Sequence, residues 1–398
     1  MKMTFIVFCY FFSLNTAIAA DSIIWQKEIS INSNSSCQPG AMMVDKKNNE
    51  VIILGAPVER DTKEPVFLLW KMDPNGNIKQ KRPLGLVSKN KLLAAVSLGM
   101  KAVVKPDTGD IIRLNMSDDD SNSISLSIIG SNMQYRAVKF DVSRKRSQVF
   151  QLNDMTSYQN ENLLFAGQEN QNGIIMKTDL AGNVIWRKIF DISQTNILSS
   201  IACTPDGMDF YVTGLSFTMT ANMTFSEHYK VRILRYDENG EIKAKDFFDG
   251  GIIPFPTILP KVLCLPSGIV LVVNDKNNKS AATQLYVNAY TAELKPLYEK
   301  QIFTTKETSP PAYFDVCPAG QNRFVLAVVT DTGDLKVFEY DADAKILQTI
   351  ELDGAVSGSS IFVDYVGGKI FAAFAARPKA NEKKTSIKLL ALQPYKTN

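Results

Sequence analysis

The chain has 398 residues, a formal net charge of +3 and 45% hydrophobic residues. Acidic and basic residues are interspersed, and the tightest basic run is only Arg144-Lys145-Arg146. Because binding to nucleic acid or to an anionic membrane requires clustered positive charge, we expect neither partner. The length would accommodate two domains, but no linker or low-complexity tract divides the chain, which favours a single domain.

The N-terminus has the pattern of a secretory signal peptide. A positive charge precedes an apolar run at residues 5–14, and Ala17 and Ala19 supply the small residues of a cleavage site. The run is too short to span a bilayer, which needs about twenty residues. We therefore expect residues 1–19 to be removed and residues 20–398 to form one periplasmic or secreted domain. The alternative is a short anchor that stays uncleaved.

Hairpin motifs recur along the rest of the chain and define an internal repeat. Each copy is a hydrophobic strand, a tight turn and a second strand. The clearest copies are Phe67–Ile78, Ile174–Val184 and Val231–Ile242, with weaker copies at Tyr286–Leu297 and Leu335–Leu347. Asn-Gly and Ala-Gly pairs in the clear copies supply the positive φ that tight hairpin turns require.

A second motif, Cys-x-Pro-x-Gly or a close variant, recurs upstream of the hairpins. Its copies begin at Cys37, Val104 (which lacks the cysteine), Cys203, Cys264 and Cys317. An apolar run follows most copies, so we interpret the motif as the turn between two further strands. The repeating unit therefore contains four strands, A to D, with one turn between A and B and another between C and D.

The spacing of the units indicates a β-propeller. Asp179 and Asp237 lie 58 positions apart, and Thr291 and Asp341 lie 50 positions apart. Four strands in such a length are typical of one propeller blade. We predict seven blades, with six or eight as alternatives, beginning near Cys37, Gly99, Gln148, Cys203, Cys264, Cys317 and Ile361.

The two ends of the chain indicate how the ring closes. The last unit ends after its third strand, at residues 387–392, while an isolated strand at residues 23–29 precedes the first full unit. We therefore expect the N-terminal strand to complete the last blade, which leaves only short protected sheet edges. The predicted fold is an all-β, seven-bladed β-propeller closed in this way.

One hairpin also resembles a known class of repeats. The segment Asp179-Leu-Ala-Gly-Asn-Val-Ile-Trp186 is similar to the Asp-x-x-Gly-Asn-x-x-Trp hairpins of bacterial exported propellers, relatives of quinoprotein-like and YVTN-type repeats. The resemblance covers nearly all of the chain after the signal peptide. It implies the fold but no activity, because propellers carry many unrelated functions.

The long and divergent segments are predicted to lie on one face. They join strand B to C or strand D to A, and comprise residues 56–65, 216–229, 275–283, 377–385, 250–260 and 304–311. Two of them are unusually apolar and are expected to be neighbours. We predict that they form a protein-binding surface with Phe217, Met219, Met223, Phe225, His228, Ile253 and Phe255. The alternative is that these side chains fold down and close the mouth of the central channel.

Residues suited to catalysis or metal binding are sparse. His228 is the only histidine, which excludes a His-rich zinc or copper site and disfavours a Ser-His-Asp triad. Asp73-Pro-Asn-Gly-Asn and Asp118-Asp-Asp offer oxygen ligands for calcium, but we interpret both as turns or loops. We therefore expect no metal and no other cofactor.

Four cysteines remain after the signal peptide: Cys37, Cys203, Cys264 and Cys317. The repeat assigns them to equivalent points of strand A, where neighbouring Cα atoms lie near or beyond the disulfide limit of about 7 Å. We expect them to be reduced and packed between blades. A disulfide between Cys264 and either Cys203 or Cys317 is the alternative.

These observations favour a non-catalytic exported monomer that binds a protein partner through the face with the long loops. It would be a scaffold, or a protein of the inhibitor or immunity type. A hydrolase or lyase acting on glycans is the main alternative, with Asp61, Glu64 and Glu227 as candidate carboxylates. A sugar-binding lectin is a second alternative.

Overall fold

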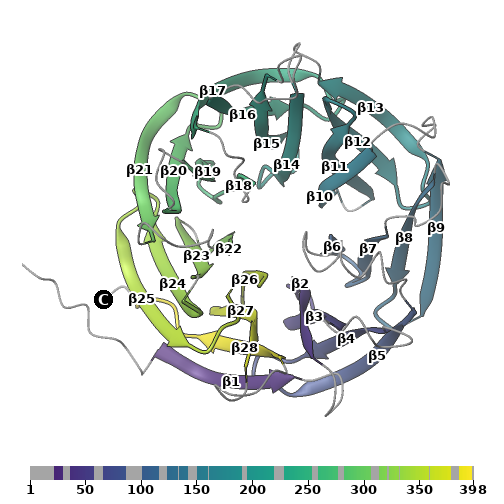
Figure 1. Cartoon of the computed structure of the whole chain (residues 1–398). Helices are drawn as coiled ribbons and strands as arrows, with labels where there is room; N and C mark the ends of the chain where they lie inside the picture. The colour runs from purple at the N-terminus through teal and green to yellow at the C-terminus, as the bar shows by residue number, and fades with distance from the viewer. Residues whose placement is uncertain are drawn as a thin grey trace, which may run out of the picture.

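The computed structural model describes most of the chain after residue 21. The described residues are 22–29, 36–57, 66–86, 101–115, 123–132, 134–141, 150–159, 161–190, 195–218, 228–252, 259–276, 282–305, 313–320, 322–330, 332–357, 359–377 and 385–396. They form 28 strands in seven antiparallel sheets of four strands each. Figure 1 shows the sheets arranged as a ring, which confirms the seven-bladed propeller. Within these residues, no helix has the length and hydropathy needed to cross a membrane.

The first four blades cover the N-terminal half of the ring. Blade 1 is β2 (Cys37–Asp45), β3 (Glu50–Pro57), β4 (Val66–Met72) and β5 (Ile78–Leu86); blade 2 is β6 (Ala102–Val104), β7 (Ile111–Asn115), β8 (Ser123–Ile129) and β9 (Tyr135–Asp141). Blade 3 is β10 (Phe150–Tyr158), β11 (Asn162–Glu169), β12 (Asn172–Asp179) and β13 (Val184–Phe190); blade 4 is β14 (Thr195–Cys203), β15 (Phe210–Phe217), β16 (His228–Tyr236) and β17 (Ile242–Ile252).

The remaining blades complete the ring. Blade 5 is β18 (Lys261–Cys264), β19 (Val270–Asp275), β20 (Gln284–Tyr290) and β21 (Pro296–Thr304); blade 6 is β22 (Tyr313–Pro318), β23 (Arg323–Val329), β24 (Asp334–Asp341) and β25 (Ile346–Asp353). Blade 7 is β26 (Ile361–Val366), β27 (Lys369–Ala376), β28 (Ser386–Leu392) and β1 (Ile23–Ile29). The first strand of each blade lies nearest the axis, and the fourth forms the outer wall (Figure 1).

The ring closes as the sequence predicted. β1 pairs antiparallel with β28, with Gln26 opposite Leu390 and Ile29 opposite Ile387. The N-terminal strand therefore supplies the outer strand of a blade whose other three strands come from the C-terminus. Closure in this manner leaves that blade with the same four-stranded sheet as the other six.

One predicted turn is wrong. The Cys37-Gln-Pro-Gly segment belongs to β2, where Gln38 lies opposite Ala56, and the turn of this blade falls later, at residues 46–49. The register shifts between Pro39 and Ala41, so the proline sits at an irregularity of the innermost strand, a position where its missing N–H is tolerated. The Asp45 carboxylate accepts the N–H groups of Lys47 and Asn48, which shapes the true turn.

The other turns follow the repeat. In four turns between strands C and D, an aspartate accepts the backbone N–H groups of the residues two and four positions later. These aspartates are Asp73, Asp179, Asp237 and Asp341, with N···O distances of 2.8–3.0 Å. Asp73 is thus hydrogen-bonded within its own turn, which confirms its interpretation as a hairpin residue.

Aromatic residues of the outer strands join each of three blades to the next. Trp25 Nε1 donates to the Pro74 carbonyl at 2.9 Å, and Trp186 Nε1 donates to the Glu238 carbonyl at 3.1 Å. Tyr298 repeats the contact by donating its hydroxyl to the Ala342 carbonyl. Each accepting carbonyl lies in the C–D turn of the following blade, so these rings link neighbouring blades.

The hydrophobic core is divided among the spaces between blades. Between blades 6 and 7, for example, Val325 and Val337 pack with Phe374 and Leu390, all at most 2% exposed. The second and third strands of these blades therefore carry apolar side chains on both faces, as expected for strands whose sheet is covered on both sides by neighbouring blades.

Candidate functional site

The connections between strands divide the propeller into two unlike faces. Short turns join A to B and C to D on one face. After residue 36, and between β1 and β2, every run of five or more residues that lies outside the described ranges joins B to C or D to A. These gaps are residues 30–35, 58–65, 87–100, 116–122, 142–149, 219–227, 253–258, 277–281, 306–312 and 378–384. The predicted grouping of the long segments therefore agrees with the strand order.

Blade 4 brings the ends of the two apolar segments together. Residues 219–227 lead into β16 at His228, and residues 253–258 follow β17 after Ile252. His228 and Ile252 are directly paired in the β16–β17 ladder. The predicted contact residues within these segments lie outside the described residues: Met219, Met223, Phe225, Ile253 and Phe255.

The two predicted contact residues that the structure describes differ in exposure. Phe217, at the end of β15, is only 4% exposed and packs in the core cluster that contains Val262 and Val270 of blade 5. Its ring therefore supports the end of the strand from within and does not present an apolar surface. The His228 side chain is 58% exposed, and its Nδ1 lies 3.7 Å from Asp249 Oδ1.

An aromatic residue that sequence reasoning missed lies beside His228 and Asp249. Phe247 of β17 is 54% exposed, and Lys230 Nζ lies 4.4 Å from the centre of its ring. Arg232 also faces this ring, at 5.7 Å, and burial lowers the pKa of its guanidinium. The sequence signal that could have identified Phe247 is its alternation with Lys245 and Asp249, because residues two apart on a strand share one face.

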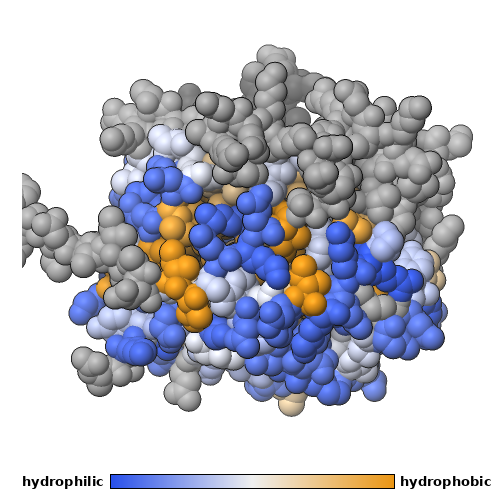
Figure 2. All heavy atoms as spheres, turned by 90° about the horizontal axis from the view of Figure 1, so that it is seen from below, coloured by the Kyte–Doolittle hydropathy of each residue, from blue (hydrophilic) through white to orange (hydrophobic). Residues whose placement is uncertain are grey.

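The outer wall near β1 differs from this region. Figure 2 shows mostly hydrophilic residues on that side, with separate hydrophobic patches. Exposed Ile24, Ile78 and Ile346 lie on the outer strands β1, β5 and β25, at 40–47% exposure. Hydrophobic residues scattered in this way are ordinary for a folded protein and do not define a binding surface.

Acidic side chains of the inner strands tie neighbouring blades together near the axis. Asp154 Oδ2 accepts the Ile201 N–H at 3.0 Å, and Asp315 Oδ2 accepts the Val363 N–H at 2.9 Å. Asp315 Oδ1 also accepts a hydrogen bond from Lys261 Nζ at 2.5 Å. These carboxylates are held by the scaffold, so we assign them a structural role.

Two further charged groups near the axis are perturbed by burial. Desolvation raises the pKa of Asp364 to about 6, although hydrogen bonds from the Tyr365 and Val44 N–H groups oppose the shift. Desolvation also lowers the pKa of Lys101, an effect that Asp154 and Asp315 partly offset. Both shifts follow from burial of a charge and need no catalytic explanation.

The described ranges contain no cluster of metal ligands. They contain no group of three or more His, Cys, Asp or Glu residues that could hold a metal ion. The candidate glycan-processing carboxylates Asp61, Glu64 and Glu227, and the acidic segment at Asp118, lie outside the described residues.

The four cysteines are free thiols in this structure. Cys203, Cys264 and Cys317 occupy the ends of their inner strands, but Cys37 begins its strand, so the predicted equivalence of all four is wrong. Cys37 donates instead to the Ile29 carbonyl, near the closure of the ring. Burial raises the pKa of the Cys203 thiol to about 12 and that of Cys264 to about 11.

Comparisons with known proteins support the fold but identify no activity for this chain. No family model and no curated protein matches the chain. The chain is similar to the structure of an ulvan lyase, a polysaccharide lyase bound to a fragment of glucuronic acid and sulfated rhamnose. The TM-score is 0.58 at 9% identity, over 92% of this chain and 96% of that chain. It is also similar to puromycin hydrolase, with a TM-score of 0.50 at 13% identity, over 85% of this chain and 50% of that chain. At such identities the likeness shows only the propeller fold.

Proposed function

We propose that this protein, after export and removal of residues 1–19, binds a protein partner through the long-loop face at blade 4. The observation that carries the proposal is the pairing of His228 with Ile252. This pairing places the ends of the two apolar segments, residues 219–227 and 253–258, side by side. Met and Phe side chains gathered at one place on a soluble protein are typical of an adaptable protein-binding surface.

The base of this surface is rigid. Tyr229 is 1% exposed, and its hydroxyl donates to the Asp275 carbonyl of blade 5 at 2.8 Å. A Cβ added at Gly250 would lie 2.1 Å from the Tyr229 ring. The backbone of β17 at Gly250 therefore packs directly against this ring. A platform fixed in this way reduces the ordering cost of binding.

The side of the platform carries groups suited to the edge of an interface. Phe247 offers an exposed ring, and Lys230, His228 and Asp249 place charged or polar groups beside it. Aromatic residues surrounded by polar groups are common at protein interfaces. By contrast, the aspartates of the opposite face are occupied by their own turns.

The test is a pull-down from the protein's own extracytoplasmic extract with residues 20–398 as bait, followed by mass spectrometry. The variant Met219→Ser/Met223→Ser/Phe255→Ser is compared with the control Ile185→Ser/Ile189→Ser. The control removes isoleucines of β13 that are 50% and 54% exposed, in another blade. We expect one stoichiometric partner that the control retains and the triple variant loses.

Two results would overturn the proposal. One is a partner that the folded triple variant binds as tightly as the unmodified protein. The other is the release of new sugar ends when the purified protein is incubated with polysaccharides, which would establish a glycan-processing enzyme instead.

A further inference from the structure

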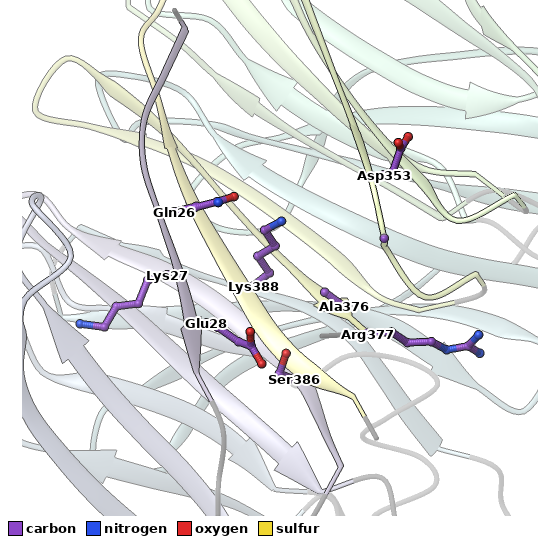
Figure 3. Close-up of a pocket in the computed structure, with 9 residues that line it drawn as sticks. Gln26, Lys27, Glu28, Asp353, Ala376, Arg377, Ser386 and Lys388 are labelled. Atoms are coloured by element: carbon purple, nitrogen blue, oxygen red, sulfur yellow. The ribbon is translucent and has the colours of Figure 1, made fainter. Parts of the chain in front are cut away.

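A polar cavity lies in the outer part of the ring between blades 6 and 7. It has a volume of about 300 Å³ and is lined by Gln26, Lys27, Glu28, Asp353, Gly354, Ala376, Arg377, Ser386 and Lys388. The lining therefore includes the end of β25, both edges of the 378–384 gap, and the closing strand β1 (Figure 3). Blade 4, with the proposed partner surface, lies across the ring (Figure 1).

Four of the lining side chains share one face of the closing sheet. Glu28 lies directly opposite Lys388 in the β1–β28 ladder. Because side chains alternate along a strand, Gln26 lies on the same face as Glu28, and Ser386 on the same face as Lys388. Figure 3 shows these four side chains together and Lys27 pointing away from them. Lys27 donates to the Gly76 carbonyl of blade 1 at 2.6 Å.

The cavity contains hydrogen-bonding groups that the described protein does not use. Ser386 is 3% exposed, and its Oγ is buried without a hydrogen-bond partner. Such an orphaned hydroxyl is costly and uncommon in folded proteins, so it indicates a missing partner at this position. Among the described residues, Glu28 and Lys388 also take part in no ion pair, although they face each other across the ladder.

The arrangement of charge identifies the class of ligand. Apart from Lys27, which points away, the lining carries two negative charges on Glu28 and Asp353 and two positive charges on Arg377 and Lys388, so these formal charges cancel. The signs are also interleaved, because Glu28 stands opposite Lys388. A carboxylate ligand that approached Lys388 would be repelled by the neighbouring Glu28. A zwitterion would fit best in a cavity with its negative charges at one end and its positive charges at the other, which this cavity does not have.

Hydroxyl groups satisfy such a mixed lining best, because each one both donates and accepts hydrogen bonds. Lys388 and the Gln26 amide donate to hydroxyl oxygens, the Glu28 and Asp353 carboxylates accept from hydroxyl hydrogens, and Ser386 Oγ does either. The cavity volume lies at the lower end of the range for small-molecule pockets, about 300–1,000 Å³.

We propose that this cavity binds a neutral saccharide unit, held by Gln26, Glu28, Asp353, Ser386 and Lys388. The site is independent of the proposed partner surface. Because β1 supplies Gln26 and Glu28, a bound saccharide bridges the N-terminal strand, the C-terminal strand β28 and the end of blade 6. Binding is therefore coupled to closure of the ring.

Saturation-transfer NMR with residues 20–398 tests the proposal, using D-glucose, D-galactose and L-rhamnose as neutral probes. D-glucuronate, D-glucosamine and glycine serve as anionic, cationic and zwitterionic comparisons. We expect saturation transfer to at least one neutral sugar, and weaker binding of its charged analogue. Removal of a charge-assisted hydrogen bond in Lys388→Met is expected to raise the Kd about tenfold.

Ser386→Ala provides a second variant, which keeps the fold because it removes only an unpaired hydroxyl. It is expected to raise the Kd without lowering the melting temperature. Lys336→Met is the matched control: Lys336 pairs with Glu351 at 3.0 Å and does not line the cavity, so its loss should leave the Kd unchanged. Absence of saturation transfer to all three neutral sugars, tighter binding of a charged probe, or equal Kd values in all variants would overturn the proposal.

Discussion

Replacement of Asp364 by Asn is expected to change how the stability of the propeller depends on pH. Asp364 lies on the inner strand β26, and its carboxylate accepts the N–H groups of Tyr365 and Val44. Burial raises the pKa of this carboxyl from its ordinary value of 3.8 to about 6. Nearby Lys46 opposes the shift, and Asp315 adds to it.

The sign and the size of the effect follow from this pKa. A pKa that is higher in the folded state means that the native protein holds the proton more tightly than the unfolded chain. The stabilisation is complete below pH 3.8 and is lost as the pH rises through about 6. Since one pH unit corresponds to about 1.4 kcal/mol, ionisation of Asp364 costs the native state about 3 kcal/mol at neutral pH.

Asn cannot ionise, so the variant avoids this cost. Urea unfolding of the two proteins at several pH values between about 3 and 8, followed by circular dichroism, measures the difference. Relative to the unmodified protein, Asp364→Asn should gain about 3 kcal/mol of unfolding free energy between the acidic and the neutral end. An equal pH dependence in both proteins would refute a raised pKa for the Asp364 carboxyl.

Three other predictions follow from packing and burial. Trp25→Ala removes the hydrogen bond to the Pro74 carbonyl and the ring that covers Gly76. It should therefore lower the unfolding free energy by about 3 kcal/mol, and an unchanged melting temperature would contradict this. Phe217→Ala should cost about 3–5 kcal/mol, because the ring is buried between blades 4 and 5; a loss of partner binding at full stability would instead make it a contact residue. The thiols of Cys203 and Cys264, whose pKa values are about 12 and 11, should resist iodoacetamide at pH 8 until urea unfolds the protein; rapid labelling of the native protein would disprove their burial.

The blade pattern was predictable because it depends on short sequence motifs, above all the turn residues. Turn residues with positive φ, such as Gly76, Gly182 and Gly240, mark the C–D hairpins, and the structure has these conformations there. The strand at residues 23–29 could be assigned to the last blade because that unit lacked a fourth strand. Both inferences needed only the order of strands and the requirement that sheet edges be paired.

Local signals failed where two structures suit the same residues. A proline followed by glycine suggested a turn after Cys37, but Pro39 sits in the irregular part of an inner strand. Whether this segment forms a turn or a strand depends on the pairing of β2 with β3 and on the neighbouring blades of the ring. The error also misplaced Cys37 relative to the other cysteines.

Exposure and site chemistry were decided by the tertiary structure alone. Phe217 and Phe247 are both phenylalanines in strands of blade 4, yet packing against blade 5 buries the first, while the second stays on the outer wall. Likewise, Glu28 and Ser386 lie near opposite ends of the sequence and share one cavity only because the ring closes between β1 and β28. The sequence by itself determined the strands and most of the turns, because these depend on residues close along the chain, and it determined the mode of closure because the last unit lacked a fourth strand. The surroundings of each side chain were settled only by contacts between blades, which join residues far apart in the sequence.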